Sequence, residues 1–300
     1  MLLPITVISQ EEFSNHPLLA RLLTLHDIPE KIYIQGRLPE VTIDEYERLK
    51  PRILTIVGSR KNTNYGHDVL EKLINEISGE PIIIVSGLAL GIDGIAHRKA
   101  LKNNLTTIAI PGSGLDKKVI YPATHFSLSQ EILETNGCLI SELAPDTPAA
   151  QWTFPARNRI MSAFADAILI VEAEEKSGTL ITARQSLELG RDIGAIPGSI
   201  FSSTSVGANS LIKDGATPIT SREDLLELLH LPQNNEEKET LELLLTEDEQ
   251  SVFELLVENV SRDELLIKSN LPMQRFLIAI SNLEIKGYIQ DTFGEVRRIV

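Results

Sequence analysis

The sequence predicts an α/β protein in which an extended, Rossmann-like, doubly wound parallel sheet is followed by a small C-terminal winged-helix domain. Between residues 51 and 230, short apolar runs rich in β-branched residues alternate with helical patterns, as in parallel sheets covered by helices on both faces. The expected strands are Ile53–Val57, Ile82–Val85, Thr106–Ile110, Cys138–Ile140, Ile168–Val171 and Ile193–Ile196. The expected helices are Val69–Ile77, Ile92–Leu101, Ser127–Glu134, Ile160–Phe164 and Leu180–Leu189.

The flanking segments carry weaker patterns. Residues 1–50 are expected to be an N-terminal extension, with a short helix over Leu18–Leu25. Residues 231–245 open with a polar, acidic tract and are expected to be a linker. The winged-helix domain is expected at residues 246–300, where helical patterns over Glu247–Glu258, Arg262–Lys268 and Met273–Lys286 lead into a hairpin that ends at Val300.

Composition narrows the class of protein. The chain has 300 residues, of which 42% are hydrophobic and 23% charged, as in a globular protein with a proper core. Cys138 is the only cysteine and the six histidines lack metal-ligand spacing, so we expect no disulfide, metal or cofactor. The short apolar start before Glu11 does not fit a signal peptide, and no stretch is long enough to span a bilayer. We therefore expect a cytoplasmic protein without a membrane partner.

The net charge of −14 argues against nucleic-acid binding by the whole surface. The charge is unevenly distributed along the chain, however. Residues 231–300 carry 7 Lys and Arg against 14 Asp and Glu, whereas residues 51–165 carry 11 against 10. Any nucleic-acid interface is therefore expected in the second of these stretches.

Unusual residues gather in the turns that follow the expected strands. Because the carboxyl ends of parallel strands meet at one edge of a sheet, these turns are expected to converge there and bind a ligand. The turns are Gly58-Ser59-Arg60, Ser86–Gly91, Pro111-Gly112-Ser113-Gly114 and Ser177-Gly178-Thr179.

The turn from Ser86 to Asp93 follows a strand and opens a helix. Free backbone N–H groups and the helix dipole predict an anion site there, with Gly87 and Gly91 permitting close approach and the Ser86 hydroxyl adding a donor. The alternative is a tight turn shaped by glycine alone. Asp93 and His97 share one helix face, which permits a catalytic dyad, but Asp93 bracing the helix start and His97 packing beside it is the favoured interpretation.

Several basic residues are candidates for phosphate contact. The guanidinium of Arg60 suits bidentate phosphate binding, although a solvated turn is the alternative. Arg157 and Arg159 begin a helix, where the dipole disfavours cations, so either an internal carboxylate or an external anion should compensate them. They are two residues apart, which leaves a structural role open for one of them. Lys117 and Lys118 lie near aromatic residues, as single-strand binding sites do, or else in a solvated loop.

The turn Ser177-Gly178-Thr179 lies just after Glu172. Ser177 or Thr179 can cap the following helix, and the turn again offers N–H donors. In a nucleotide hydrolase Glu172 would be an acid or base, but its neighbours Glu174 and Glu175 favour a solvated acidic edge.

Together these motifs resemble the DNA-processing protein A family (DprA, also called Smf), which acts in natural transformation and recombination. The resemblance spans roughly residues 53 to 216, and the upstream phrase HPLLARLLTLHDIPEKIYIQG is similar to the family's lead-in. The matching stretches are ILTIVGSRKNTNYG, IVSGLALGIDGIAHRKAL, FPARNRIMSAFADAILIVEA, KSGTLITARQSLELGRDIGAIPG and GANSLIKDGA.

The resemblance implies a homodimer that binds single-stranded DNA, protects it and helps to load the RecA recombinase, with no covalent step. It places Arg60 and the Ser86–Asp93 turn in the DNA-contacting pocket, and Lys117 and Lys118 among further basic contacts. The loop with these lysines is about two residues longer than the family pattern, so it does not show which lysine contacts DNA. Leu90 stands where the family often has a polar or basic residue.

Two other functions are weaker alternatives. The fold is similar to that of nucleoside-monophosphate phosphoribohydrolases of the "lonely guy" (LOG) family, but the Pro-Gly-Gly turn and the glutamate of that family are missing around Thr179. A winged helix that reads duplex DNA is opposed by the acidity of residues 231–300.

Overall fold

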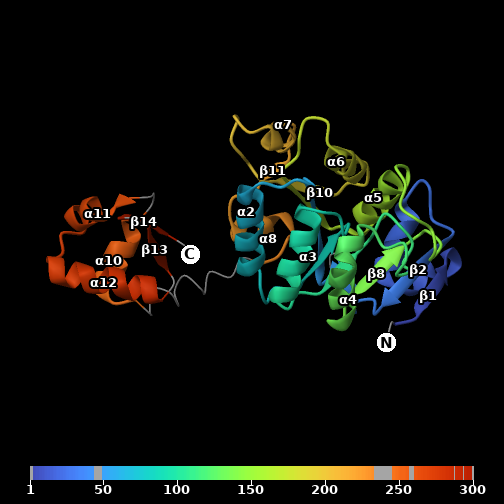
Figure 1. Ribbon diagram of the computed structural model, residues 1–300, viewed down its shortest axis with the longest axis horizontal. Helices are drawn as coiled ribbons and strands as arrows, with labels where there is room; N and C mark the ends of the chain where they lie inside the picture. The colour runs from blue at the N-terminus through green and yellow to red at the C-terminus, as the bar shows by residue number, and fades with distance from the viewer. Residues whose placement is uncertain are drawn as a thin grey trace. The chain divides into compact units, whose positions relative to one another are not determined.

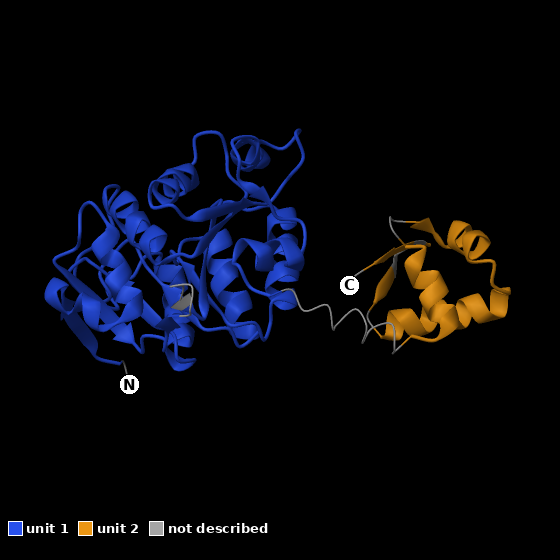
Figure 2. Cartoon of the chain, turned by 180° about the vertical axis from the view of Figure 1, so that it is seen from behind, with its two compact units in different colours: residues 1–232 blue, residues 233–300 orange. Residues whose placement is uncertain are grey.

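The structure, a computed structural model, describes residues 3–43, 49–232, 245–256, 260–286, 288–292 and 294–298. It divides the chain into two compact units, residues 1–232 and 233–300 (Figure 2). Most of the linker expected at 231–245 lies outside the described residues, as do the end of the helix expected over Glu247–Glu258 and the hairpin end at Val300. None of the described helices is both long and apolar enough to cross a membrane.

The described part of the first unit is built on a nine-stranded sheet in the order β1-β2-β8-β7-β6-β5-β9-β10-β11 (Figure 1). From β8 to β11 all neighbours are parallel, while β2 is antiparallel to both β8 and β1. The predicted α/β class is therefore confirmed. The strands are β1 Ile5–Ser9, β2 Lys31–Gly36, β5 Arg52–Gly58, β6 Ile82–Ser86, β7 Thr107–Ala109, β8 Cys138–Ser141, β9 Ala167–Val171, β10 Asp192–Ala195 and β11 Thr217–Pro218; β3 Thr42–Ile43 and β4 Leu49–Lys50 form a separate pair.

Helices cover both faces of this sheet because alternate strand residues are apolar on each side. Ile53 packs in one cluster with Leu22 and Phe164, and its neighbour Leu54 packs in another with Leu70. The first face is covered by η1 Gln10–Asn15, α1 Pro17–Ala20, η2 Arg21–Thr24, α5 Thr153–Phe164, α6 Gly178–Glu188 and α7 Val206–Lys213. The second is covered by α2 Asn64–Glu76, α3 Ile92–Lys102, α4 Phe126–Glu134 and α8 Arg222–Leu228. The short turns η3 Ala123–His125 and η4 Ser203–Ser205 precede α4 and α7.

The N-terminal segment is part of this unit, which corrects the separation of residues 1–50 from the α/β domain. Strand β2 pairs with β8 and carries β1 on its outer side. Phe13, Leu18 and Leu22 are buried in the same cluster as Phe164. The helix expected over Leu18–Leu25 is divided into α1 and η2, because the chain turns there to bury these side chains.

The second unit has a core of its own, which includes Val252, Phe253, Leu265, Phe276 and Val296. Within its described residues, a three-stranded antiparallel sheet has the order β12-β14-β13. The elements are α10 Glu247–Glu254, β12 Val260–Ser261, α11 Arg262–Ser269, α12 Met273–Ile285, β13 Ile289–Thr292 and β14 Glu295–Arg298. The helices and the hairpin lie where the sequence places them, and the assignment to the winged-helix class stays a prediction.

Asp166 ties the N-terminal segment to the sheet. Its Oδ1 lies 2.5 Å from Nη2 of Arg21, and its Oδ2 accepts a hydrogen bond of 2.7 Å from the backbone N–H of Ile53. Nη1 of Arg21 also donates to the carbonyls of Phe164 and Ala165, at 2.7 and 3.0 Å. One carboxylate therefore joins η2, the entry to β9 and the start of β5.

We expect Asp166→Ala to lower the free energy of unfolding by about 2–4 kcal/mol, because it leaves a largely buried guanidinium and a buried N–H without their acceptor. Urea unfolding measures the change. Glu40→Ala is the matched control, since Glu40 pairs with Arg37 on the exposed surface. Equal effects of the two substitutions would show that Asp166 does not hold these elements together.

Candidate nucleic-acid interface

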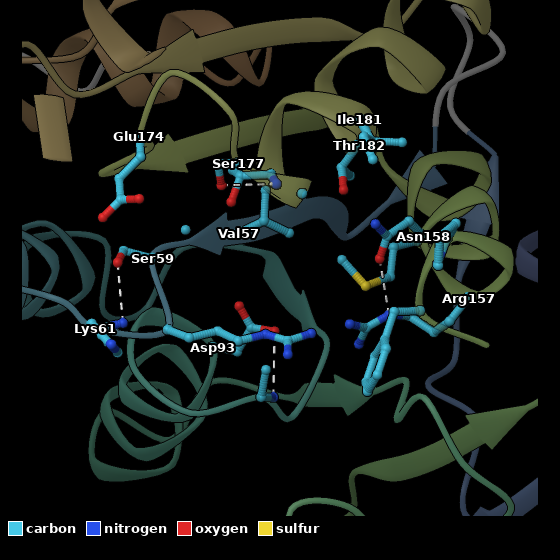
Figure 3. Close-up of a pocket in the computed structure, with 18 residues that line it drawn as sticks. Val57, Ser59, Lys61, Asp93, Arg157, Asn158, Glu174, Ser177, Ile181 and Thr182 are labelled. Carbon is cyan, nitrogen blue, oxygen red and sulfur yellow. Dashed lines mark hydrogen bonds between the residues drawn. The ribbon is translucent and has the colours of Figure 1, made fainter. Parts of the chain in front are cut away.

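A pocket of about 470 Å³ opens at the carboxyl edge of the sheet, beyond the ends of β5, β6 and β9. Ser59, Lys61 and Asp93 lie on one side of it, and Glu174, Ser177 and Thr182 on the other (Figure 3). The pocket is lined by Val57, Gly58, Ser59, Arg60, Lys61, Ala89, Asp93, Phe154, Pro155, Arg157, Asn158, Met161, Glu174, Ser177, Gly178, Thr179, Ile181 and Thr182.

The structure gathers about half of the predicted site residues around this pocket. The predicted residues that line it are Gly58, Ser59, Arg60, Asp93, Arg157, Ser177, Gly178 and Thr179. The predicted residues that do not line it are Ser86, Gly87, Gly91, Gly112, Gly114, Lys117, Lys118 and Arg159. Most residues of the second group either pack behind the pocket or lie apart from it.

The turn after β5 is pressed against the start of α3. The Ser59 carbonyl accepts a hydrogen bond of 3.1 Å from the N–H of Ile92, and a Cβ on Gly91 (φ +74°) would lie 2.2 Å from the same carbonyl oxygen. The N–H of Gly94 donates to the Ala89 carbonyl at 3.1 Å. The N–H groups of Ile92 and Gly94 at this helix start are therefore used within the chain, and the phosphate contact predicted for Gly91 stays a prediction.

Ser86 also has a structural role. It is fully buried, and its hydroxyl donates to the Ile56 carbonyl of the neighbouring strand at 2.7 Å. The prediction that this hydroxyl contacts phosphate is corrected, because a ligand in the pocket cannot reach it.

Asp93 and Arg157 are buried charges at the base of the pocket. Burial raises the pKa of the Asp93 carboxyl, while the positive charge of Arg157 and the N–H of Ala89, 3.4 Å from Oδ2, act in the opposite direction. Burial lowers the pKa of Arg157 to about 10, and the charge of Asp93 opposes this shift. At neutral pH Arg157 therefore stays a cation. Asp93 braces the turn, as the favoured interpretation of the sequence had it.

The Arg157 guanidinium is held by the backbone after β7 and by its neighbour on α5. Its Nη1 donates to the Ile110 carbonyl, and its Nε donates to Oδ1 of Asn158 at 3.1 Å. Gly87 makes room for it, since a Cβ there would lie 1.8 Å from Nη1. Gly112 similarly makes room for the ring of Phe154, which lies 2.6 Å from where a Cβ would be. These two glycines shape the site, and the phosphate contacts predicted for them stay predictions.

Arg60 and Phe154 lie at the mouth of the pocket, and a second aromatic ring, that of Tyr121, lies beside Phe154. The exposed guanidinium of Arg60 lies over the ring of Phe154, with Cζ 4.6 Å from the ring centroid. The ring of Tyr121, which is also exposed, lies 5.8 Å from that of Phe154 at an interplanar angle of 60°. The sequence analysis did not single out Phe154 or Lys61, although Phe154 begins the FPARNR stretch that carries Arg157.

On the opposite wall, α6 begins at the predicted turn. The Ser177 side chain caps it by accepting a hydrogen bond of 3.1 Å from the Thr179 N–H. Glu172 does not line the pocket. Its buried carboxylate accepts from the N–H and the hydroxyl of Thr63, at 2.8 and 2.5 Å, and so holds the start of α2. The acidic residue on the wall is instead Glu174.

The remaining predicted cations lie elsewhere. Arg159 forms an ion pair with Glu142 and donates to the backbone of Asp27, so an internal carboxylate compensates it, and its contact with DNA stays a prediction. Lys117 and Lys118 are exposed, and Nζ of Lys117 lies 5.2 Å from the centroid of the Phe126 ring. Gly114 packs against the carbonyls of Ala144 and Pro145.

The chain can now be compared with known proteins. Residues 5–230 match the sequence model of a family described as DNA recombination-mediator protein A. The chain belongs to this family. The protein Smf of Escherichia coli (strain K12) is 34% identical over 292 residues, which cover 93% of this chain and 74% of Smf. The DNA processing protein DprA of Bacillus subtilis (strain 168) is 38% identical over 214 residues, covering 71% of this chain and 68% of DprA.

Solved structures of family members have the same fold. DNA processing protein A from Streptococcus pneumoniae is 34% identical, with a TM-score of 0.65 and 74% of each chain covered. A structure of DNA processing protein A from Helicobacter pylori, described for its single-stranded DNA binding mode, is 28% identical, with a TM-score of 0.62 over 77% of this chain and 98% of that chain. The resemblance predicted from the motifs is confirmed.

His97 lies behind the site. Its environment is expected to make the stability of the protein sensitive to pH. The ring is fully buried, and its Nδ1 lies 2.7 Å from the hydroxyl oxygen of Thr107. Burial lowers the pKa of His97 to about 3, and the positive charge of His125 acts in the same direction. A packed, hydrogen-bonded ring agrees with the favoured interpretation of the sequence and does not fit a catalytic dyad.

Because the folded state keeps His97 neutral, acid should destabilise the protein. The unfolded chain binds this proton below about pH 6.5 and the folded chain only near pH 3, so stability falls as the pH drops through this window. Between pH 7 and pH 5 we expect wild type to lose about 2 kcal/mol more than His97→Gln, which has no proton to gain. Urea unfolding at both pH values measures this, and parallel losses in the two proteins would refute it.

Proposed function

We propose that this chain is a recombination mediator that binds single-stranded DNA at the pocket mouth and performs no covalent step on it. The observation that carries the proposal is the exposed Arg60 guanidinium stacked on Phe154 at the carboxyl edge of the sheet. The relative from Helicobacter pylori, described for its single-stranded DNA binding mode, supports the choice of ligand.

The mouth offers both interactions that single strands use. Stacking on Phe154 occupies one face of the Arg60 guanidinium and leaves its N–H edge free to bind a phosphate in bidentate fashion. The Phe154 and Tyr121 rings offer apolar surface for unstacked bases, a type of contact that contributes about 1–3 kcal/mol per base. Duplex DNA hides these base faces, so the arrangement favours single strands. Sequence preference should be low, because phosphates and ring faces are common to all nucleotides.

Phosphate recognition rests on side chains and on the α6 turn. Arg60 and Lys61 bring exposed positive charge to the pocket, and the turn Ser177-Gly178-Thr179 faces them across it. Glu174 on the same wall limits the net positive charge. With a chain of net charge −14, we expect binding of moderate strength that weakens with added salt.

Catalysis is disfavoured by the position of Glu172, the residue that the sequence offers as an acid or base in a nucleotide hydrolase. It is buried, it accepts hydrogen bonds from Thr63, and it is not among the pocket-lining residues. Release of free base from nucleoside monophosphates, abolished by Glu172→Gln, would contradict the binding-only proposal.

The family relationship supports two further parts of the proposal. The chain acts as a homodimer, and it protects single strands and helps to load the RecA recombinase onto them in natural transformation or recombination. Membership of a DNA recombination-mediator family supports this role.

We expect Arg60→Ala to weaken binding of a labelled oligothymidine by about tenfold or more at low salt, because one bidentate phosphate contact is lost. The slope of log affinity against log salt should fall by roughly 0.7, the value for one phosphate contact on a single strand. Phe154→Leu should weaken binding without changing this slope, since it removes stacking and no charge. Fluorescence anisotropy across a salt series measures the affinities of both variants and the salt slopes.

Arg37→Ala is the matched control. It removes the same charge from an exposed side chain after β2, at the amino edge of the parallel strands. Wild-type binding that is equally reduced by Arg37→Ala and Arg60→Ala would mean that only overall charge matters. Failure of the wild type to bind single strands at low salt would overturn the proposed function.

We also expect the wild-type chain to shorten the lag before RecA hydrolyses ATP on single strands coated with single-strand-binding protein. Arg60→Ala should lose this effect, because a loader must hold the strand. A lag that the wild type leaves unchanged would remove the loading role and leave single-strand binding in place.

A further inference from the structure

The second unit carries an apolar surface on α12. Helix α12 buries Phe276, Ala279, Ile280 and Leu283 against the core of this unit. The opposite side, which we call the outward face of α12, consists of Met273, Gln274, Leu277, Ile278, Ser281 and Ile285, all of them exposed. This helix therefore has apolar residues on both sides, whereas a surface helix usually has a polar outer face.

The exposure of the aliphatic residues is large. The exposed fractions are 58% for Met273, 41% for Leu277, 57% for Ile278 and 84% for Ile285. Single exposed aliphatic residues are common, but four on one face of one helix form a patch of the kind found at protein–protein contacts. None of these six residues is charged, and the exposed Glu284 lies at the edge of the face, between Met273 and Leu277.

The cations of α12 are directed away from this face. Arg275 forms two hydrogen bonds with Asp248 of α10, at 2.5 and 2.6 Å, and Nζ of Lys286, just after the helix, lies 2.6 Å from Glu249. On α11, Lys268 pairs with Glu264 at 2.8 Å. These contacts leave the unit with its excess of carboxylates, 14 acidic against 7 basic residues over 231–300.

This charge decides between the possible occupants of the outward face. Duplex DNA is disfavoured, because the third helix presents aliphatic side chains on an acidic unit in place of basic ones. A second copy of the same face is disfavoured, because it would bring two strongly acidic units together. A partner with a matching apolar face and positive charge has neither problem.

We propose that the outward face of α12 docks a basic amphipathic helix of a partner protein. Apolar residues of such a helix, spaced as i, i+3 or i+4, and i+7, would cover Leu277, Ile278 and Ile285. Glu284 stands in line with Met273 and Leu277 on the helix surface, where it can pair with a Lys or Arg of the partner. The chain would thus bind single-stranded DNA with its first unit and a partner protein with its second unit.

The test uses the full chain and a synthetic peptide of Leu and Lys, as long as α12 and patterned as an amphipathic helix. Fluorescence anisotropy measures its binding to wild type and to Ile278→Gln/Ile285→Gln. We expect the double variant to bind about tenfold more weakly, because two central apolar contacts are lost. The same peptide with Glu in place of Lys should not bind the wild type.

Ile43→Gln/Ile200→Gln is the matched control, since these isoleucines of the first unit are similarly exposed, at 59% and 82%. It should leave peptide binding unchanged, and single-strand binding by Ile278→Gln/Ile285→Gln should equal that of the wild type. The proposal is overturned if the Leu–Lys peptide fails to bind, binds both double variants alike, or binds no better than its Glu counterpart. It is also overturned if Ile278→Gln/Ile285→Gln abolishes either self-association or duplex binding.

Discussion

The buried guanidinium of Arg157 is the interaction on which the site depends. Arg157 is the fifth residue of α5, and a cation out of contact with water is unfavourable unless several groups compensate it. Asp93 from α3, the Ile110 carbonyl after β7 and the Asn158 side chain supply that compensation. Asp93 lies on α3, Ile110 lies after β7, and Asn158 is on α5 itself, so satisfying this one charge requires α3, the turn after β7 and α5 to take up their positions together.

This requirement divides the carboxyl edge of the sheet into a buried layer and an exposed rim. In the buried layer, Gly87 leaves space for the guanidinium and Gly91 lets the turn after β5 approach α3. The rim stands on this rigid base, and its members Arg60 and Phe154 contact each other while remaining open to a ligand. Rigid support of this kind lowers the entropy lost when a flexible single strand binds.

Much of this architecture could be predicted from the sequence. Apolar runs located the parallel strands, and the turns after them located the edge where the pocket lies. The N-terminal strands were missed, because β1 is a short edge strand of mixed burial. Arg157 and Arg159 could not be told apart, since both stand just before Ile160, where the sequence predicts a helix. Only the fold shows that Arg157 donates to the Ile110 carbonyl while Arg159 meets Glu142.

By itself, the sequence determined the α/β class, the order of the turns at the carboxyl edge and the family to which the chain belongs. These features depend on local periodicity and on residues with special backbone freedom, which can be read within a short window. The tertiary structure alone decided which donors and charges are already occupied. Ser86 meets Ile56 across 30 residues and Arg157 meets Ile110 across 47, so their roles depend on desolvation and on partners that only folding brings together.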